Sequence, residues 1–314
     1  MRAPKPERHP PPQRWREHTV AAGEAGQTVE QILTGSLGIS RRMIQKLTRS
    51  KGILRNRKAP FLGARVRAGD VVAARVASEE DAGLEPVTME LDIVHEDADV
   101  LVINKPPFML VHPTTAEHRS TLAHGVAFHF QQQGLRTKVR PVHRIDRDTS
   151  GLVLFAKTAF AHQRLDRQLR ERTLQREYLA LVHGELADDA GVIDQPIGRD
   201  KQQGSQLRVV RTGGEPATTR FEVVEKLGGA TLVRLAMETG RTHQIRVHLA
   251  HIGHPVLGDR QYGREGLSLI KRQALHASRL AFLHPSSDEP LTCEAPLPED
   301  IAQLRERLRA EPSG

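Results

Sequence analysis

The chain has 314 residues, of which 38% are hydrophobic, and this is enough to bury a large core with a smaller domain beside it. Lysine and arginine outnumber aspartate and glutamate by 46 to 38, which favours nucleic acid as partner over an acidic membrane surface. The single cysteine, Cys293, excludes a disulfide framework and a cysteine-based zinc knuckle within one chain. The sequence has no apolar run of membrane-spanning length and no secretory h-region, so we expect a cytoplasmic protein.

The first part of the chain divides into a tail and a small domain. Residues 1–20 are rich in proline and arginine, which predicts a disordered or extended tail. Residues 21–76 predict a small α+β domain, in which Ser40 is a good N-cap for an amphipathic helix. The polar face of that helix consists of basic residues: Arg41, Arg42, Lys46 and Arg49.

The small domain carries most of the charge excess. Residues 27–72 hold ten basic residues and two acidic ones. A charge run is more often a solvated face than a binding site, but bases repeated along one helix and the loop after it suit phosphate groups. We therefore name Arg41, Arg42, Lys46 and Arg49 as candidate RNA-binding residues.

The rest of the chain divides into three further parts. Residues 77–90 are acidic and irregular and predict a linker. Residues 91–305 predict the large domain, in which hairpins are frequent and βαβ units are few. Residues 306–314 predict a C-terminal tail.

A polar loop at 141–151 runs directly into an apolar strand and has Asp146 at its centre. Arg144 and Arg147 flank this carboxylate and would hold it ionised if they approach within a few ångströms. An ionised aspartate in a basic loop can act as a nucleophile or base towards a sugar carbon. It can equally hold the loop together, because such residues are common in turns.

Two other side chains stand out. Tyr178 lies in a predicted strand at 177–182, where tyrosine usually serves packing. Arg246 lies beside the apolar face of a predicted helix and therefore needs a carboxylate partner. The histidines around this helix lack zinc-ligand spacing, so we expect no metal; they are His243, His248, His251 and His254.

The loop sequence His-Arg-Ile-Asp-Arg-Asp-Thr-Ser-Gly at 143–151 resembles the catalytic signature of the RluA-type pseudouridine synthases. The segments around Tyr178 and at 238–249 resemble the second and third motifs of that family, in the same order. The resemblance covers residues 90–295 and implies an α+β fold with a mixed, mostly antiparallel sheet and flanking helices. The hairpin-rich pattern agrees with this fold.

The resemblance implies that the protein isomerises uridine to pseudouridine in ribosomal or transfer RNA, without cofactor or metal. We expect a monomer. Asp146 would be the catalytic residue and would act at the ribose, either by attacking C1′ or by removing the C2′ proton. Arg246 would keep Asp146 charged, Tyr178 would stack on the flipped base, and Arg144 would enter the helical stack.

The small domain resembles an S4 RNA-binding domain. It departs from the usual Val-Asn-Gly turn, because Arg55-Asn56-Arg57 stands there. The alternative function is a catalytically silent RNA-binding or ribosome-assembly module. The intact set of Asp146, Tyr178 and Arg246 favours the enzyme over this alternative.

Overall fold

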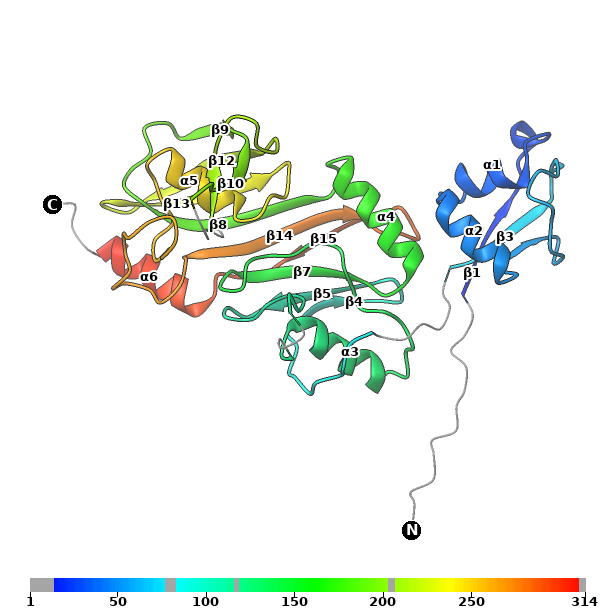
Figure 1. The fold of residues 1–314 in the computed structure, drawn as a ribbon, viewed down its shortest axis with the longest axis horizontal. Coiled ribbons are helices and arrows are strands. Elements are labelled where there is room, and N and C mark those ends of the chain that lie inside the picture. Colours follow the sequence, from blue (N-terminus) through cyan, green and yellow to red (C-terminus); the bar gives the residue numbers. More distant parts are fainter. Residues whose placement is uncertain (1–13, 77–82, 116–118, 203–206, 311–314) are drawn as a thin grey trace, which may run out of the picture.

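The computed structural model describes residues 14–76, 83–115, 119–202 and 207–310. Figure 1 shows a small N-terminal unit beside a larger body that is built on one long sheet. The predicted α+β class, with a mixed and mostly antiparallel sheet, is confirmed.

The N-terminal unit has a three-stranded antiparallel sheet in the order β1–β3–β2, and two helices pack with it around one apolar core. The side chains of Thr28 and Ser40 cap these helices by accepting hydrogen bonds from backbone N–H groups three residues later. The elements are β1 (Trp15–Thr19), the 3₁₀ turn η1 (Ala22–Glu24), α1 (Val29–Thr34), α2 (Arg41–Arg49), β2 (Ile53–Arg55) and β3 (Val71–Arg75).

The prediction of a tail over residues 1–20 is wrong from residue 15 onward. Trp15–Thr19 forms β1 and pairs with β3 along its whole length, and Val20 is buried in the core. Strand β1 is polar and lies at the edge of the sheet, where backbone hydrogen bonds to β3 hold it. The sequence therefore shows no apolar run that would predict this strand. Residues 1–13 lie outside the described residues.

The turn after Arg55 forms without the glycine that is usual there. Asn56 and Arg57 both adopt the left-handed conformation, with φ of 50° and 67°. The Asn56 side chain donates to Asp70 at 2.7 Å and accepts from the Val71 N–H at 2.8 Å. These bonds hold the turn in a conformation that asparagine tolerates well.

The large body contains a ten-stranded sheet whose central path runs β4–β5–β7–β14–β8–β13–β12–β9, with β15 on β14 and β6 on β7. All its pairs are antiparallel except that of β14 with β7. The strands are β4 (Ile93–Glu96), β5 (Val100–Lys105), β6 (Arg140–Pro141), β7 (Ser150–Ala156), β8 (Gln175–His183), β9 (Ala190–Asp194), β12 (Thr218–Lys226), β13 (Ala230–Met237), β14 (Leu275–Leu283) and β15 (Pro290–Glu294).

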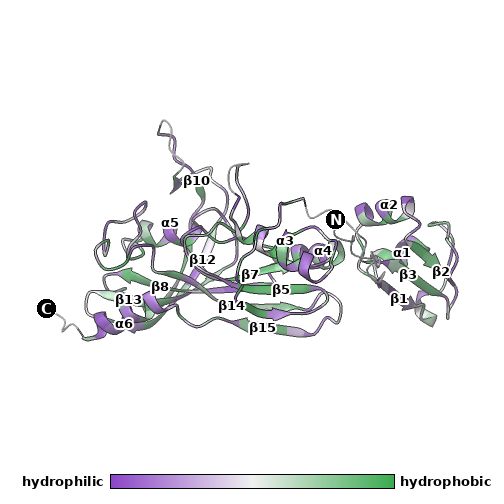
Figure 2. Cartoon of the chain, turned by 90° about the horizontal axis from the view of Figure 1, so that it is seen from below, coloured by the Kyte–Doolittle hydropathy of each residue, from purple (hydrophilic) through white to green (hydrophobic). Residues whose placement is uncertain are grey.

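Strands β5 and β7 are covered on both faces, since successive side chains of a strand point to opposite sides. One core contains Val153 and Phe155, while the other contains Leu152 and Leu154. Helix α3 packs on the face of Val153 and Phe155, and α4 packs on the face of Leu152 and Leu154. Figure 2 shows hydrophobic residues along β5 and β7, which lie between these two layers. The remaining elements are α3 (Leu122–Gln132), α4 (Ala159–Arg170), α5 (Gln244–His251), α6 (Glu299–Ala310) and the small hairpin β10 (Ile197–Arg199) with β11 (Arg208–Val210).

Two predicted boundaries of the large domain need correction. The linker predicted at 77–90 already packs on the large body from Leu84, and the Val87 N–H donates to the His124 carbonyl. The tail predicted at 306–314 is helical to residue 310, where Leu308 is buried in the main core. In both places a few apolar residues reach the core from segments that look polar as a whole.

The two parts are docked on each other through α4. Phe160, at the start of this helix, is fully buried in the core of the N-terminal unit. Gln163 donates to the Gly38 carbonyl at 2.8 Å and accepts from the Ser40 N–H at 2.9 Å. This side chain therefore bonds directly to the turn that precedes the basic helix α2.

Candidate active site

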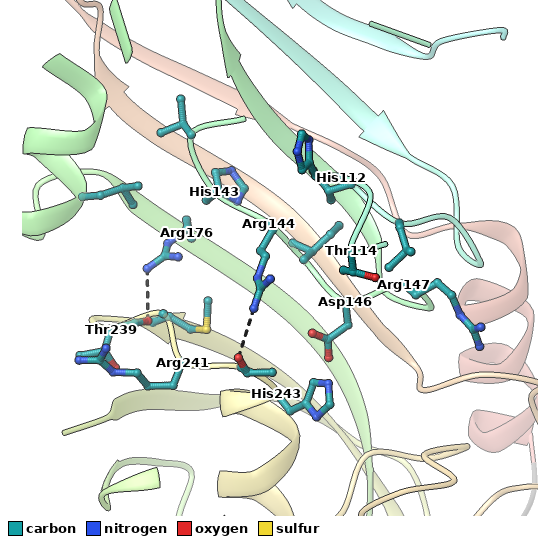
Figure 3. Close-up of a pocket in the computed structure, with 18 of the residues that line it drawn as sticks. His112, Thr114, His143, Arg144, Asp146, Arg147, Arg176, Thr239, Arg241 and His243 are labelled. Carbon is teal, nitrogen blue, oxygen red and sulfur yellow. Dashed lines mark hydrogen bonds between the residues drawn. The ribbon is translucent and has the colours of Figure 1, made fainter. Parts of the chain in front are cut away.

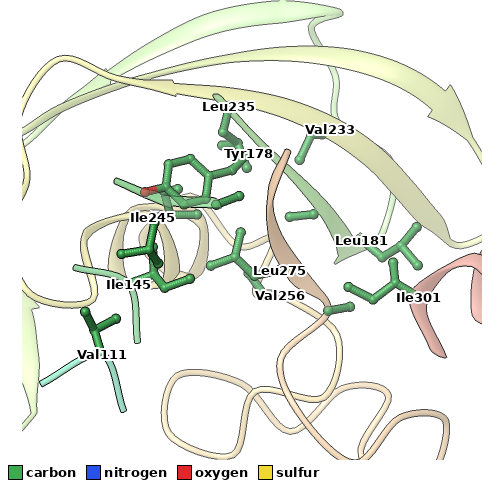
Figure 4. Packing of buried hydrophobic residues seen from close by; sticks show 14 of the residues in the cluster. Val111, Ile145, Tyr178, Leu181, Val233, Leu235, Ile245, Val256, Leu275 and Ile301 are labelled. Atoms are coloured by element: carbon green, nitrogen blue, oxygen red, sulfur yellow. The ribbon is translucent and has the colours of Figure 1, made fainter. Parts of the chain in front are cut away.

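The loop that carries Asp146 connects β6 to β7 at the centre of the large sheet. Ile145 points into the main core (Figure 4), while the carboxylate of Asp146 stays 25% exposed. Gly151, the second residue of β7, has φ of 111°, and a Cβ there would lie 2.2 Å from the Ala277 carbonyl oxygen. Only glycine lets β7 begin this close to β14, and this contact fixes the end of the loop.

Arg246 on α5 reaches this loop from a position 100 residues further along the chain. Its Nη1 donates to Oδ2 of Asp146 at 2.9 Å. Its Nε and Nη2 bond both oxygens of Asp259 at 2.6 and 2.8 Å, and Gln261 accepts a further bond at 2.7 Å. The guanidinium is 5% exposed and lies 4.9 Å from the Tyr262 ring, so packing and hydrogen bonds both fix its orientation.

The neighbouring arginines of the loop do not pair with Asp146. Arg147 bonds Asp148 at 2.7 Å, and Arg144 donates to the Thr242 hydroxyl at 3.3 Å (Figure 3). In an extended loop, adjacent side chains point in different directions, so closeness in sequence does not bring these charges together. The cation beside Asp146 comes from α5 instead.

Asp146 opens onto a cavity of about 800 Å³ between the loop, the end of α4 and the segment before α5. Its lining is strongly basic, with two carboxylates, Asp146 and Glu238, against six arginines: Arg144, Arg147, Arg170, Arg172, Arg176 and Arg241. An inner recess of about 50 Å³ adjoins it and brings together four residues named from the sequence: Arg144, Asp146, Tyr178 and Arg246. A cavity with this excess of basic side chains suits a polyanionic substrate.

Tyr178 forms part of the wall of the inner recess. Its side chain is 3% exposed and packs among Leu235 and Ile245 (Figure 4). Burial raises the pKa of its hydroxyl, and Asp146 adds to this effect, so the phenol stays neutral. The ring is thus a fixed aromatic surface at the recess.

Other residues named from the sequence lie elsewhere or have other contacts. Arg41, Arg42, Lys46 and Arg49 are exposed on α2 in the N-terminal unit. His248 bonds the Thr219 hydroxyl and the Gln195 carbonyl inside the large body. Across the four described ranges, the structure contains no group of three or more potential ligand side chains that could hold a metal ion.

The sequence reasoning missed two buried residues that support the site. Asp259 is fully buried and bonds Arg246. The sequence pointed to it only indirectly, because an arginine beside an apolar helix face needs a carboxylate partner. Lys105 is also fully buried, and its ammonium donates to the carbonyls of Pro106 and Arg147 beneath the loop. Burial and the nearby Arg272 lower its pKa to about 7.

Comparison with known proteins identifies the family. Residues 99–251 match the model of the RNA pseudouridylate synthase family. The chain is 44% identical over 273 residues to "Uncharacterized RNA pseudouridine synthase YlyB" of Bacillus subtilis (strain 168), covering 86% of this chain and 90% of that protein. The chain belongs to the RNA pseudouridine synthase family. It is RluA-like, as the motif at 143–151 indicated, and the prediction of an enzyme is confirmed.

Two further relatives agree with this assignment. "Ribosomal large subunit pseudouridine synthase D" of Nitrosomonas europaea is 39% identical over 308 residues, covering 94% of this synthase and 88% of that protein. The solved structure "Human RNA Pseudouridylate Synthase Domain Containing 1" has a TM-score of 0.55 and 28% identity over 73% of this chain and 99% of its own. The helices in the described ranges of the synthase are all too short or too polar to cross a membrane.

Proposed function

We propose that this synthase isomerises uridine to pseudouridine in ribosomal RNA, with Asp146 as the catalytic residue. The observation that carries the proposal is the arrangement around Asp146: its Oδ2 is bonded to Arg246, and its Oδ1 has no hydrogen-bond partner in the described ranges. A carboxylate held charged and half free is suited to act on the ribose. The relatives named "Ribosomal large subunit pseudouridine synthase D" support ribosomal RNA as the substrate.

The surrounding residues have complementary roles in this proposal. Arg246 supports the negative charge of Asp146 through its hydrogen bond, and the bonds to Asp259 hold its guanidinium in place. Tyr178 offers its ring to the flipped uracil, where stacking contributes roughly 1–3 kcal/mol per base. Arg144 is exposed at the mouth of the recess and fills the gap that the flipped base leaves in the RNA helix.

The N-terminal unit, residues 14–76, is an S4-like RNA-binding domain in this proposal. The support is the exposed basic face of α2 and the ten basic residues between 27 and 72. Arg41, Arg42, Lys46 and Arg49 would contact phosphates and hold RNA of any sequence. Residues 84–310 form the catalytic domain, and the buried thiol of Cys293 suits a reducing cytoplasm.

Asp146→Asn tests the proposal. We expect turnover to fall by on the order of 10⁴-fold or more, because the amide keeps the shape but loses the charge and nucleophilicity. RNA affinity and thermal stability should stay near wild type, since Arg246 remains paired with Asp259. Tritium release from ribosomal RNA labelled at uracil C5 measures turnover. The control is Asp148→Asn, which alters a carboxylate of the same loop that is paired with Arg147; equal activity in both variants would overturn the assignment.

A further inference from the structure

His243 stands immediately before α5, between the large cavity and the inner recess, and lines both. Its backbone has φ of 58°, a left-handed conformation that is uncommon for any residue other than glycine. Figure 3 shows its ring beside the carboxylate of Asp146. This uncommon backbone conformation keeps a polar ring at the reacting centre, where the proposed roles of Asp146, Tyr178 and Arg246 leave it unused.

The hydrogen bonds around Tyr262 determine which ring nitrogen carries the proton. The Tyr262 oxygen accepts the backbone N–H of Arg208 at 3.0 Å and lies 2.7 Å from Nδ1 of His243. In the described ranges Nδ1 is the only acceptor bonded to the Tyr262 hydroxyl, so we assign the phenol proton to this hydrogen bond. Nδ1 is therefore the acceptor, and the hydrogen of the neutral imidazole is on Nε2.

The surroundings keep this ring neutral. Burial lowers the pKa of His243 below its usual value of 6.5, and Arg246 and Arg208 act in the same direction. Asp146 and Asp259 oppose them without reversing the result. At neutral pH the ring therefore presents an uncharged N–H donor, and in the described ranges Nε2 has no hydrogen-bond partner.

We propose that Nε2–H of His243 donates a hydrogen bond to a carbonyl oxygen of the flipped uracil. When the C1′–N1 bond breaks, its electron pair leaves with the base, and negative charge develops on the two carbonyl oxygens. A donor already oriented at that position stabilises this charge more than it stabilises the neutral uridine. A phosphate is a poorer match for a single neutral donor, because the six arginines of the cavity compete for it.

This inference rests on the proposed role of the Asp146 site, and three variants test it. His243→Ala should lower kcat by about 10²-fold with little change in KM for RNA, as for the loss of one oxyanion donor. His243→Gln should recover at least about tenfold of this loss, because its amide nitrogen can take the place of Nε2. Tyr262→Phe removes the group that fixes the tautomer and should give an intermediate loss. If the glutamine variant is as slow as the alanine variant, or the alanine variant as fast as wild type, the inference is wrong.

Sulfur-substituted RNA identifies the acceptor. Substrates with 2-thiouridine or 4-thiouridine at the target position replace one carbonyl oxygen by a weak acceptor. One of the two substrates should lower the turnover of the wild-type enzyme but not lower the turnover of His243→Ala any further. If both substrates lower turnover by the same factor in the two enzymes, His243 does not contact the uracil. NMR of the ring nitrogens should show hydrogen on Nε2 in wild type and a mixture in Tyr262→Phe. This measurement needs no turnover, so it remains informative even if Asp146→Asn stays active and the proposed function fails.

Discussion

Arg246 is shared between a structural carboxylate and the proposed catalytic one. Asp259, which is fully buried, takes two of its N–H groups, and Asp146, which is partly exposed, takes one. A guanidinium has a rigid fork of donors, so fixing one edge on Asp259 also fixes the direction of Nη1. The buried pair therefore orients the charge that faces the cavity.

Replacing Arg246 by methionine should lower the free energy of unfolding by about 3–5 kcal/mol, because Asp259 is left buried without its cation. Activity should be lost at the same time. Denaturant unfolding measures the first effect and tritium release the second. The matched variant Asp146→Asn should lose activity alone. If Arg246→Met unfolds at the same denaturant concentration as wild type, the pair with Asp259 does not stabilise the fold.

Lys105 should make stability depend on pH in a defined window. Its pKa is about 7 in the folded protein and 10.5 in the unfolded chain, so between these values the unfolded state binds more protons. The contribution of Lys105 to stability therefore rises as pH increases from 7 towards 10.5. Lys105→Met should lack this rise, whereas Lys138→Met, at an exposed position, should keep it. Parallel pH profiles for Lys105→Met and wild type would contradict the prediction.

The sequence predicted the residues of the candidate site better than the buried residues that hold them in place. Asp146, Tyr178, Arg144 and Arg246 were all named from motifs, and the structure brings all four to one recess. Arg144 and Arg147 were expected to hold Asp146 ionised if they approach it closely, but the structure bonds them to Thr242 and Asp148 instead. Asp259 was missed because a buried partner of an arginine can come from any part of the chain.

At the scale of elements, α4 joins the two parts of the enzyme. Its first turn enters the N-terminal unit through Phe160 and Gln163, and Arg170 at its other end lines the cavity. The helix thus connects the N-terminal unit to the cavity through side-chain contacts. Local sequence patterns do not show that the first residues of this helix complete the core of another unit.

Phe160→Ala should weaken the N-terminal unit and its docking by about 3–5 kcal/mol, because a large ring is removed from a filled core. Hydrogen exchange in α1 and α2 should become faster, while exchange in β7 and β14 stays as in wild type. The control is Phe61→Ala, since Phe61 is 80% exposed. If exchange in α1 and α2 is the same in all three proteins, the contact has no role in holding the unit.

The fold was predictable where hydrophobic periodicity was strong. The capped helix α2 was predicted, with Ser40 as its N-cap. Strand β1 was missed because backbone pairing with β3 holds a polar segment, and the last turns of α6 were missed because Leu308 is buried within a polar segment. Such segments are held by long-range pairing, which local sequence patterns do not encode.

At the scale of the whole molecule, positive charge lies at two sites on one docked body: the exposed face of α2 and the cavity. We expect RNA to contact both. Changing Arg41, Arg42 and Arg49 together to glutamine should reduce the salt dependence of RNA affinity by roughly 0.7–0.9 in log–log slope for each phosphate that the protein no longer neutralises. Turnover of saturating RNA should change little, because these residues lie outside the cavity.

The control for this experiment changes Arg305 and Arg309 to glutamine. They lie on α6, at the opposite end of the molecule from α2 (Figure 1), and pair with Glu225. Affinity measured at several salt concentrations should show the slope of wild type for this control. A wild-type slope for the α2 variant as well would mean that this face does not bind RNA.

The position of Phe160 also affects how the chain can be made. Residues 14–76 leave the ribosome before the ring that completes their core, because Phe160 follows β4, β5, α3, β6 and β7 in the chain. At about 5–20 residues per second, this delay lasts several seconds. During that time we expect the side chains that later contact Phe160 to be exposed to solvent. Exposed apolar surface of this kind is what chaperones bind. The order of synthesis thus makes the first unit of this enzyme depend on the second for its final stability.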